Sequence, residues 1–454
     1  MADDSSTSVA ATPPAGTHRA PRNSIRGRLR SAFAGTRALR VPAFRVLFAA
    51  QVVSFVGTWS QNLATSLLVL HLTGSAAALG LVTAIQFAPT LLLSPVTGRV
   101  LDRVDVRRLL IATAAASAAT ALVLAALTAV DRAPLWSVGV AVGALGIAQA
   151  FDRPGIYTLI PRVVDADHRP SAISLITMSG AAARLAGPAL AGLLYATVGP
   201  AACFAVNGAS YVVVIGALVA VPRLRAGAAA PTGAVTPAEP AAAPPKPTGP
   251  AAGGLGLGYA WRHRDLRAAL LANLAIGCLT FNFGVMLAAM VTFTYRAGSG
   301  TVGIAYSTDA VGAVLGGLIA VGAAVTRRRL ALACAALGLT IGAAGLAPSL
   351  TLFLAALPIM GVAITVYQST VTALVQQVSD PGMLGRMMSL LTLGWFGTTP
   401  VGALLIGWVA DAFSARAAMV VAGGTCVVCA VLLLAPRRRA GAVGMTPSRE
   451  EGAT

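Results

Sequence analysis

Long apolar stretches, separated by short polar segments, run through most of the chain. A helix needs about 20 apolar residues to cross the hydrocarbon core of a bilayer. The pattern therefore predicts an all-α polytopic membrane protein with twelve spans, at residues 45–71, 76–98, 108–130, 135–156, 171–196, 200–221, 266–293, 301–325, 330–347, 350–377, 387–412 and 416–435.

One segment breaks this pattern between the sixth and seventh spans. Residues 223–262 contain seven prolines among alanines and glycines, a composition typical of an extended linker. The first residues are rich in Ala, Pro, Ser and Arg, which favours disorder. We therefore expect a cytoplasmic tail at 1–44, a six-helix bundle at 45–222, a cytoplasmic linker at 223–262, a second six-helix bundle at 263–436 and a cytoplasmic tail at 437–454.

The two predicted bundles share a weak internal repeat. At an offset of 215 residues, seven positions of the first half (Asp165, Ser174, Leu175, Thr177, Gly187, Leu190 and Gly192) match Asp380, Ser389, Leu390, Thr392, Gly402, Leu405 and Gly407. Parallel repeats of six spans place a substrate site between them, near the middle of the membrane. The repeat predicts a pseudo-symmetric pair of bundles.

Composition supports the membrane interpretation. Hydrophobic residues make up 56% of the chain and charged residues 11%, with a mean hydropathy of +0.78. Soluble domains carry about a quarter charged residues. The net charge of +18 is spread over the N-terminus and the segments between apolar runs, without a basic domain interleaved with aromatic residues. We expect the lipid bilayer, and no nucleic acid, as a partner.

Arginine placement predicts the orientation. With the N-terminus inside, arginines crowd the inner segments, whereas the outer loops hold Arg132, Arg296 and Arg416. Positive residues accumulate on the cytoplasmic side of membrane proteins. We expect a multi-pass protein of the bacterial inner membrane with both termini in the cytoplasm.

The sequence argues against an enzyme. Lys246 is the only lysine, so a nucleotide-binding P-loop is impossible, and none of the four histidines lies deep in a span. The five cysteines lie in apolar runs and are interpreted as packing residues. We expect no catalytic residues, no metal and no cofactor, with a proton gradient as the energy source. A membrane scaffold or sensor stays possible, but the chain has no soluble output domain.

Polar side chains within the spans are unevenly distributed. Apart from Arg108 and Arg416 at their first positions, the third, ninth and twelfth spans contain no Asn, Gln or charged residue, and the sixth contains Asn207 alone. Such side chains are costly in lipid and face protein or a water-filled cavity. Every third helix is therefore predicted to lie outermost, against lipid.

The remaining polar residues predict a central cavity. The candidates for its lining are Thr58, Gln61, Asn62, Gln86, Gln149, Arg184, Asn273, Asn282, Asp309 and Gln368. Several lie on helical stripes, such as Ser54, Thr58, Gln61 and Thr65 on one face of the first span. For any single residue, a hydrogen bond between helices is an equally good interpretation.

The loop after the second span carries the sharpest motif. Its spacing is GxxxDRxxxRR, formed by Gly98, Asp102, Arg103, Arg107 and Arg108. The motif resembles the loop signature of the major facilitator superfamily. That resemblance implies a conformational latch between the two halves, to which we also assign Asp152 and Arg153 at the inner end of the fourth span.

Further segments resemble one branch of that superfamily, the enterobactin-exporter-like transmembrane secretion effectors. They are Leu72–Ser75, Leu79–Val82, Phe151–Pro154 and Ala183–Pro188. Within the fifth span, Gly187, Pro188 and Gly192 resemble the antiporter motif of exporters. The resemblance implies the major facilitator fold and proton-coupled export of a siderophore, drug or secondary metabolite by alternating access, with a proton-linked importer as the alternative.

Two charges inside spans are the strongest mechanistic candidates. Asp309 is predicted to take up and release the coupling proton, because a buried carboxyl group can exist in both forms. Arg184 is predicted to bind an anionic part of the small-molecule substrate, or to serve as a structural hydrogen-bonding centre. The resemblance implies a monomer as the working unit.

Overall fold

The computed structural model describes residues 36–221, 256–320, 325–380 and 382–435, and these residues are helical with no strands. Twelve segments of this described part are long and apolar enough to cross a membrane, in agreement with the predicted twelve spans. The predicted tails lie largely outside the described residues, as does most of the predicted linker. Residues 257–262 of that linker form a short helix, α8 (Leu257–Arg262).

The N-terminal bundle contains six spans. They are α2 (Pro42–Thr73), α3 (Ala76–Arg103), α4 (Val106–Ala129), α5 (Leu135–Val163), α6 (Arg169–Thr197) and α7 (Pro200–Ala220). Two short 3-10 helices, η1 (Arg37–Arg40) and η2 (Ala166–His168), precede α2 and α6. Polar side chains start several of these helices: Ser75 accepts a hydrogen bond from the Ala78 amide, and Asp105 from the Arg107 amide.

The C-terminal bundle repeats this arrangement with two interruptions. Its elements are α9 (Arg264–Leu279), α10 (Phe283–Ala289), the π-helix η3 (Met290–Thr294), α11 (Ser299–Ala320), α12 (Arg327–Leu346), α13 (Leu350–Val378), α14 (Leu384–Thr392), the π-helix η4 (Leu393–Gly397), α15 (Thr399–Ala412) and α16 (Ala415–Leu434). The predicted seventh and eleventh spans are confirmed, but each is composed of several helical elements. The seventh breaks at Thr280–Asn282, and the eleventh widens into η4.

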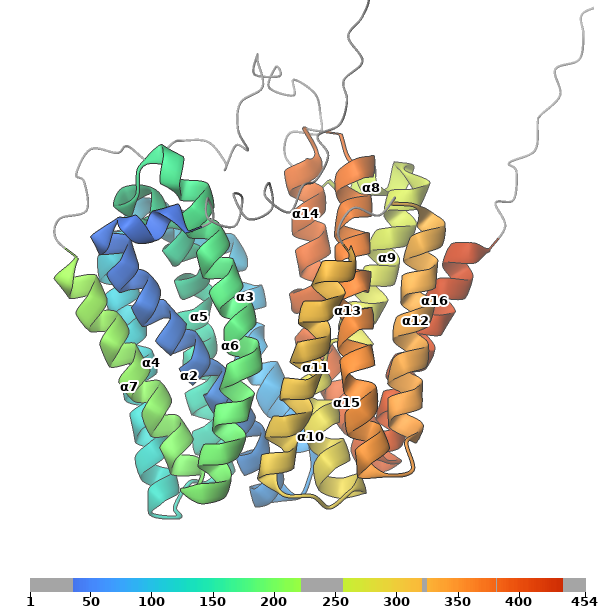
Figure 1. Cartoon of the computed structure of the whole chain (residues 1–454), viewed down its shortest axis with the longest axis horizontal. Coiled ribbons are helices and arrows are strands. Elements are labelled where there is room, and N and C mark those ends of the chain that lie inside the picture. The colour runs from blue at the N-terminus through green and yellow to red at the C-terminus, as the bar shows by residue number, and fades with distance from the viewer. Residues whose placement is uncertain (1–35, 222–255, 321–324, 381, 436–454) are drawn as a thin grey trace, which may run out of the picture.

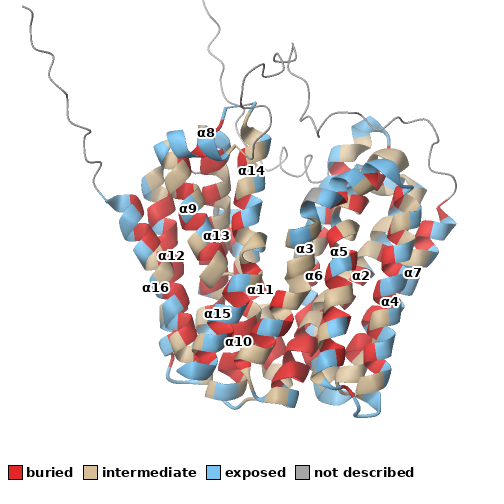
Figure 2. Cartoon of the chain, turned by 180° about the vertical axis from the view of Figure 1, so that it is seen from behind, coloured by how far each residue is buried: buried red, intermediate tan, exposed pale blue. Residues whose placement is uncertain are grey.

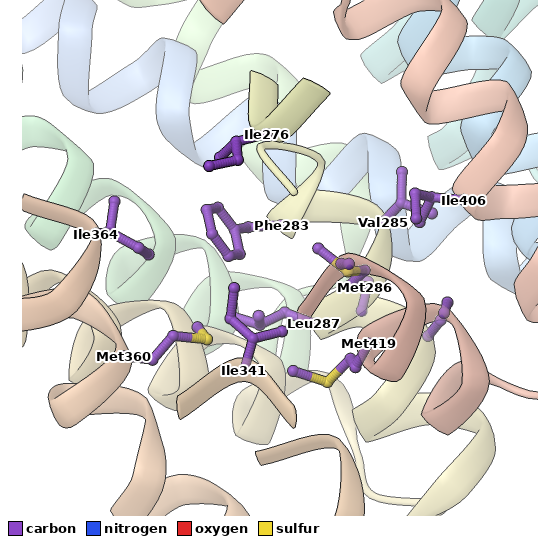
Figure 3. Packing of buried hydrophobic residues seen from close by; sticks show 14 of the residues in the cluster. Ile276, Phe283, Val285, Met286, Leu287, Ile341, Met360, Ile364, Ile406 and Met419 are labelled. Atoms are coloured by element: carbon purple, nitrogen blue, oxygen red, sulfur yellow. The ribbon is translucent and has the colours of Figure 1, made fainter. Parts of the chain in front are cut away.

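The two bundles stand side by side, with α4 and α7 at one edge and α12 and α16 at the other (Figure 1). These four helices are the third, sixth, ninth and twelfth spans, so the prediction that every third helix lies outermost is confirmed. Buried residues concentrate between the helices of each bundle, and exposed ones follow its outer surfaces (Figure 2). In the C-terminal bundle Ile276, Met286, Ile341, Met360 and Met419 fill the centre (Figure 3).

The bundles separate at one end and converge at the other (Figures 1 and 2). The separated end carries η1, the α3–α4 turn and the start of α12, with their arginines, and is called the basic end below. The opposite end, which includes Gly74 and Asp411, is called the closed end. All the contacts between bundles described next lie in the half of the molecule nearer the closed end.

Small residues bring the bundles together at the closed end. A Cβ atom on Gly192 of α6 would lie 2.9 Å from the Cα atom of Gly303 on α11, and one on Gly407 of α15 would lie 2.6 Å from the carbonyl oxygen of Ala76 on α3. Side chains at these positions would therefore force the helices apart. Alanine and glycine allow backbones to approach this closely in membranes.

A carboxylate adds a polar clamp on the α3–α15 side. Asp411 of α15 accepts hydrogen bonds from the Ser75 hydroxyl at 2.5 Å, the Ala76 amide at 2.7 Å and the Ala77 amide at 2.9 Å. Two of these donors are free amides at the N-terminus of α3, where a helix favours negative charge. Asp411 thus caps a helix of the other bundle, and this Asp411 clamp holds the closed end together.

Replacing Asp411 should loosen the closed end. Asp411→Ala removes all three hydrogen bonds, and loss of a helix cap costs about 1 kcal/mol. Nitroxide labels can be placed at positions 198 and 413, just after the ends of α6 and α15, which belong to different bundles. Double electron–electron resonance should then show a larger population of long distances between the two labels. Asp131→Asn, in the α4–α5 turn of one bundle, is the matched control and should leave the distribution unchanged. Identical distributions in the Asp411→Ala variant and the unsubstituted protein would contradict the clamp.

Candidate functional site

A cavity of about 230 Å³ lies between the two bundles. Its walls come from α2, α3 and α6 on one side, and from α10, α11, α13 and η4–α15 on the other. Arg184, one of its lining residues, lies 15 residues into the 29-residue helix α6, about 22 Å along the helix at the usual rise per residue. The cavity therefore sits near mid-membrane depth, where a pair of repeats is expected to form a site.

An ion pair crosses the cavity from one bundle to the other. The Nη2 atom of Arg184 on α6 lies 3.6 Å from the Oδ2 atom of Asp309 on α11. Asp309 is 4% exposed, whereas the Arg184 side chain is 35% exposed. The sequence predicts both residues as site candidates, but it does not predict that they pair.

Close helix packing positions the two charges. A Cβ atom on Gly361 of α13 would collide with the backbone carbonyl of Asp309, so α13 lies directly against α11 at this level. On α6, the Gly187 carbonyl accepts a hydrogen bond from the Ser60 hydroxyl of α2 at 2.9 Å. Pro188, next in the chain, has no amide to bond the Arg184 carbonyl. Of the predicted antiporter-like motif, Gly187 packs α6 onto α2, Pro188 lines the cavity, and Gly192 packs against α11.

Amide side chains supply the remaining polar lining. Gln86 donates a hydrogen bond to the Oδ1 atom of Asn62 at 3.0 Å, which joins α3 to α2. Asn282 lies in the break between α9 and α10 and donates to the Cys278 carbonyl at 2.7 Å. Gln368 of α13 also lines the cavity. Six of the ten predicted cavity residues are thus brought together: Asn62, Gln86, Arg184, Asn282, Asp309 and Gln368.

The four other candidates lie outside this cavity. Gln61 accepts a hydrogen bond from Asn207 of α7 at 2.6 Å, and the Thr58 hydroxyl lies 3.2 Å from the Tyr211 hydroxyl. Asn273 donates to the Leu391 carbonyl at 2.9 Å, and Gln149 lies on α5, which contributes no lining residue. The hydrogen-bonded residues take the alternative role, in which polar groups join helices.

The face of α2 that lines the cavity differs from the predicted one. The polar stripe through Ser54 and Gln61, which was predicted to line the cavity, is instead buried against α7. The cavity is lined instead by Trp59, Asn62 and Ser66, which follow helical spacing on the next face. Hydropathy identifies a polar face without revealing which neighbour it meets.

Aromatic rings form a part of the site that the sequence did not predict. Seven line the cavity: Trp59, Phe87, Phe281, Phe283, Tyr306, Trp395 and Phe396. The Arg184 guanidinium lies 5.9 Å from the centre of the Trp59 ring, within the range of a cation–π contact. Aromatic side chains count as apolar in a hydropathy pattern. Only their repeated occurrence near the centres of the spans could have indicated that they line the cavity.

The predicted latch residues lie at the basic end, within the N-terminal bundle. Gly98, Asp102 and Arg103 are exposed. Arg107 donates a hydrogen bond to the Val219 carbonyl of α7 at 2.9 Å, and Arg108 lies 3.7 Å from Asp105.

Two further residues were assigned to the same network. Asp152 accepts a hydrogen bond from the Thr113 hydroxyl of α4, and Arg153 follows it on α5. The contacts of Asp152, Arg107 and Arg108 therefore stay inside one bundle in this conformation, in which the basic ends are apart.

A second hollow of about 350 Å³ lies at the closed end of the N-terminal bundle. Its lining includes His71, Asp131 and Tyr195, and all its residues belong to this bundle. Motion of one bundle against the other does not change such a site. The central cavity, which both bundles line, is therefore the candidate functional site.

The chain is similar to known proteins in sequence and in fold. A family model described as transmembrane secretion effector matches residues 31–450. Macrolide efflux protein A of Streptococcus pyogenes is 24% identical over 400 residues, which cover 86% of this chain and 94% of that protein.

Solved structures share the fold at low sequence identity. A bacterial homologue of the iron transporter ferroportin, in an inward-facing state, has a TM-score of 0.67 at 14% identity, covering 87% of this chain and 98% of that one. A bacterial homologue of the human lysosomal transporter Spinster, inward-facing and unoccupied, has a TM-score of 0.64 at 16% identity, covering 88% and 95%.

The two members of the ion pair should contribute unequally to stability. Arg184→Gln leaves the buried Asp309 without its partner and should destabilise the protein by about 1–3 kcal/mol, less than for a fully buried pair because Arg184 is partly exposed. Asp309→Asn leaves a partly solvated arginine and should cost less. Thermal unfolding in detergent of both single variants and the double variant measures the coupling. Strictly additive shifts in melting temperature would exclude an energetic pair.

Proposed function

Because the chain belongs to the transmembrane secretion effector family of major facilitator transporters, we propose that it exports small molecules from the bacterial cytoplasm in exchange for protons. The observation that carries this proposal is the central cavity, which both bundles line and which helix contacts seal on one side. Such a site can face the two membrane surfaces in turn when the bundles rock.

The distribution of arginine supports an orientation for the proposed transport. Arg103, Arg107, Arg327 and Arg329 all belong to the basic end. Positive residues favour the cytoplasmic side. In this orientation the bundles are apart toward the cytoplasm, and the Asp411 clamp seals the outer side. The molecule would then have the conformation that receives a substrate from inside.

The inter-bundle ion pair supplies a route for proton coupling. α6 and α11 must separate near Gly192 and Gly303 when the outer side opens, and Arg184 and Asp309 lie on these same helices. Separation would leave a buried carboxylate without its cation, which is costly. A proton on Asp309 removes that cost, so protonation from outside favours the outward-opening motion. The charged or titratable groups at this carboxylate are Arg184 from α6 and Tyr306 on α11 itself.

Relatives guide the choice of substrates for a test. Macrolide efflux protein A is named for macrolides, so these compounds join siderophores and dyes in the first panel. The mixed polar and aromatic lining of the cavity is compatible with amphipathic molecules of this kind.

Transport by inside-out vesicles tests both direction and coupling. An imposed pH gradient, acid inside, should drive radiolabelled substrate into vesicles that contain the protein, and a protonophore should abolish this uptake. Asp309→Asn should lose the gradient-driven component, while Asp131→Asn in the α4–α5 turn keeps it. Uptake that occurs in right-side-out vesicles instead would identify an importer. Unchanged pH dependence in Asp309→Asn would exclude this carboxyl group as the coupling site.

The latch residues should matter in the other conformation. We expect Asp102→Asn to lower the turnover of transport several-fold, because the basic ends must close around this loop in each cycle. Substrate affinity in the present conformation should stay unchanged, because Asp102 is exposed and distant from the cavity lining. Transport rates and equilibrium binding, measured on the same preparation, separate the two effects. A loss of affinity equal to the loss of rate would contradict a latch.

A further inference from the structure

The short helix α8 presents an apolar face away from its bundle. Leu257 and Trp261 lie one helical turn apart on this face, and they are 55% and 59% exposed. Toward the bundle, Ala260 is buried, and the Tyr259 hydroxyl accepts a hydrogen bond from the Asp380 amide at 2.9 Å. These contacts hold α8 in place, so the exposed apolar pair is a fixed surface of the molecule.

This face lies where the surface of the membrane is expected. His263 alone separates α8 from α9, whose first residue, Arg264, begins the seventh span. Both views show α8 at the basic end of the C-terminal bundle (Figures 1 and 2). Tryptophan is enriched at the membrane–water interface, where its ring lies among the lipid headgroups. The exposed pair is therefore placed to contact lipid.

Arginines surround the exposed tryptophan. The Arg267 guanidinium lies 5.5 Å from the centre of the Trp261 ring, within the range of a cation–π contact. Arg262 and Arg264 flank the same ring in the chain, and both are exposed. An apolar surface beside exposed guanidinium groups is complementary to a molecule that joins an anionic group to a hydrocarbon chain.

The start of α12 adds positive charge to this surface. Arg327 lies 3.3 Å from Asp265 of α9, and this ion pair brings the exposed Arg328 beside α9. Residues 257–267 and 325–330 contain six arginines and one acidic residue, Asp265, which is already paired. The surface therefore has a surplus of positive charge that this part of the chain does not neutralise.

We infer that this surface binds an anionic phospholipid of the adjoining leaflet, with the phosphate at Arg262 and Arg264 and an acyl chain against Leu257 and Trp261. Clusters of basic residues beside a membrane span attract anionic headgroups, and a guanidinium can bind a phosphate through two hydrogen bonds. The inference goes beyond the proposed function and is independent of the direction of transport. A lipid held there would anchor the C-terminal bundle at its basic end.

Brominated lipids test the inference through the fluorescence of Trp261. The full chain is placed in phosphatidylcholine nanodiscs that contain an equal small fraction of brominated phosphatidylglycerol or brominated phosphatidylcholine. The emission of Trp261 is the difference between the protein and its Trp261→Phe variant. We expect the anionic bromolipid to quench this emission at least twofold more strongly than the zwitterionic one, because it is enriched at the arginines.

Another exposed tryptophan provides the matched control. Trp136 is 70% exposed and lies at the start of α5, at the closed end. Its emission, obtained in the same way with Trp136→Phe, should be quenched equally by the two bromolipids. A preference for the anionic lipid that is equal at both tryptophans would mean general enrichment around the protein, and it would overturn the inference.

Two double variants locate the headgroup. Arg262→Gln with Arg264→Gln should reduce quenching by the anionic bromolipid to the level of the zwitterionic one. Quenching by the zwitterionic lipid should stay unchanged, which also shows that α8 still lies against the bilayer. Arg37→Gln with Arg40→Gln removes two exposed arginines from η1 of the other bundle and should leave the preference at Trp261 intact.

Other occupants of this surface give different results. Emission of Trp261 that neither bromolipid quenches would mean that a protein segment or a second copy of the chain covers the surface. Equal quenching by both bromolipids would mean contact with lipid without selection of the headgroup. Either result would overturn the inference, as would an equal loss of the preference in the two double variants.

Discussion

The structure depends on the interface at the closed end, which must hold the two helical bundles together and still allow them to separate. Lipid provides little hydrophobic force between helices, so packing and hydrogen bonds must hold them. Glycine contacts such as Gly192 on Gly303 let the backbones of α6 and α11 approach each other closely. The charged contacts are few and individually breakable, as the 3.6 Å separation of Arg184 from Asp309 illustrates. These are the properties of an interface that forms and parts repeatedly.

Much of this architecture could be predicted from the sequence. The spans, their division into two bundles and the outermost position of every third helix all follow from where the chain tolerates polar groups. Arg184 and Asp309 could be identified as site candidates because isolated charges in apolar spans are energetically costly and usually have a function. Their pairing could not be predicted, because it depends on the relative placement of α6 and α11, which lie in different bundles.

Other parts of the site could not be predicted without the tertiary structure. Gln61 and Asn273 are as polar as Asn62 and Asn282, yet they serve to join helices. The break in the seventh span at Thr280–Asn282 could not be predicted either, because glycines and threonines occur throughout the spans. Breaks of this kind are tolerated at membrane depth where the backbone lines a cavity, which is where this one lies. Such a break gives an amide side chain a position that a continuous helix would not offer.

The Asp411 clamp has no counterpart on the other side of the closed end. The internal repeat aligns Asp411 with Ala196, so the junction of α6 with α11 lacks the carboxylate that caps α3. That junction is held by the glycine contact, by a long hydrogen bond of 3.4 Å from Ser307 to the Leu185 carbonyl, and by the Arg184–Asp309 ion pair. The two sides of this interface are therefore held by different kinds of interaction. Separating the bundles at this end therefore requires two different steps: hydrogen bonds to the amides of α3 must break on one side, and a pair of opposite charges must part on the other.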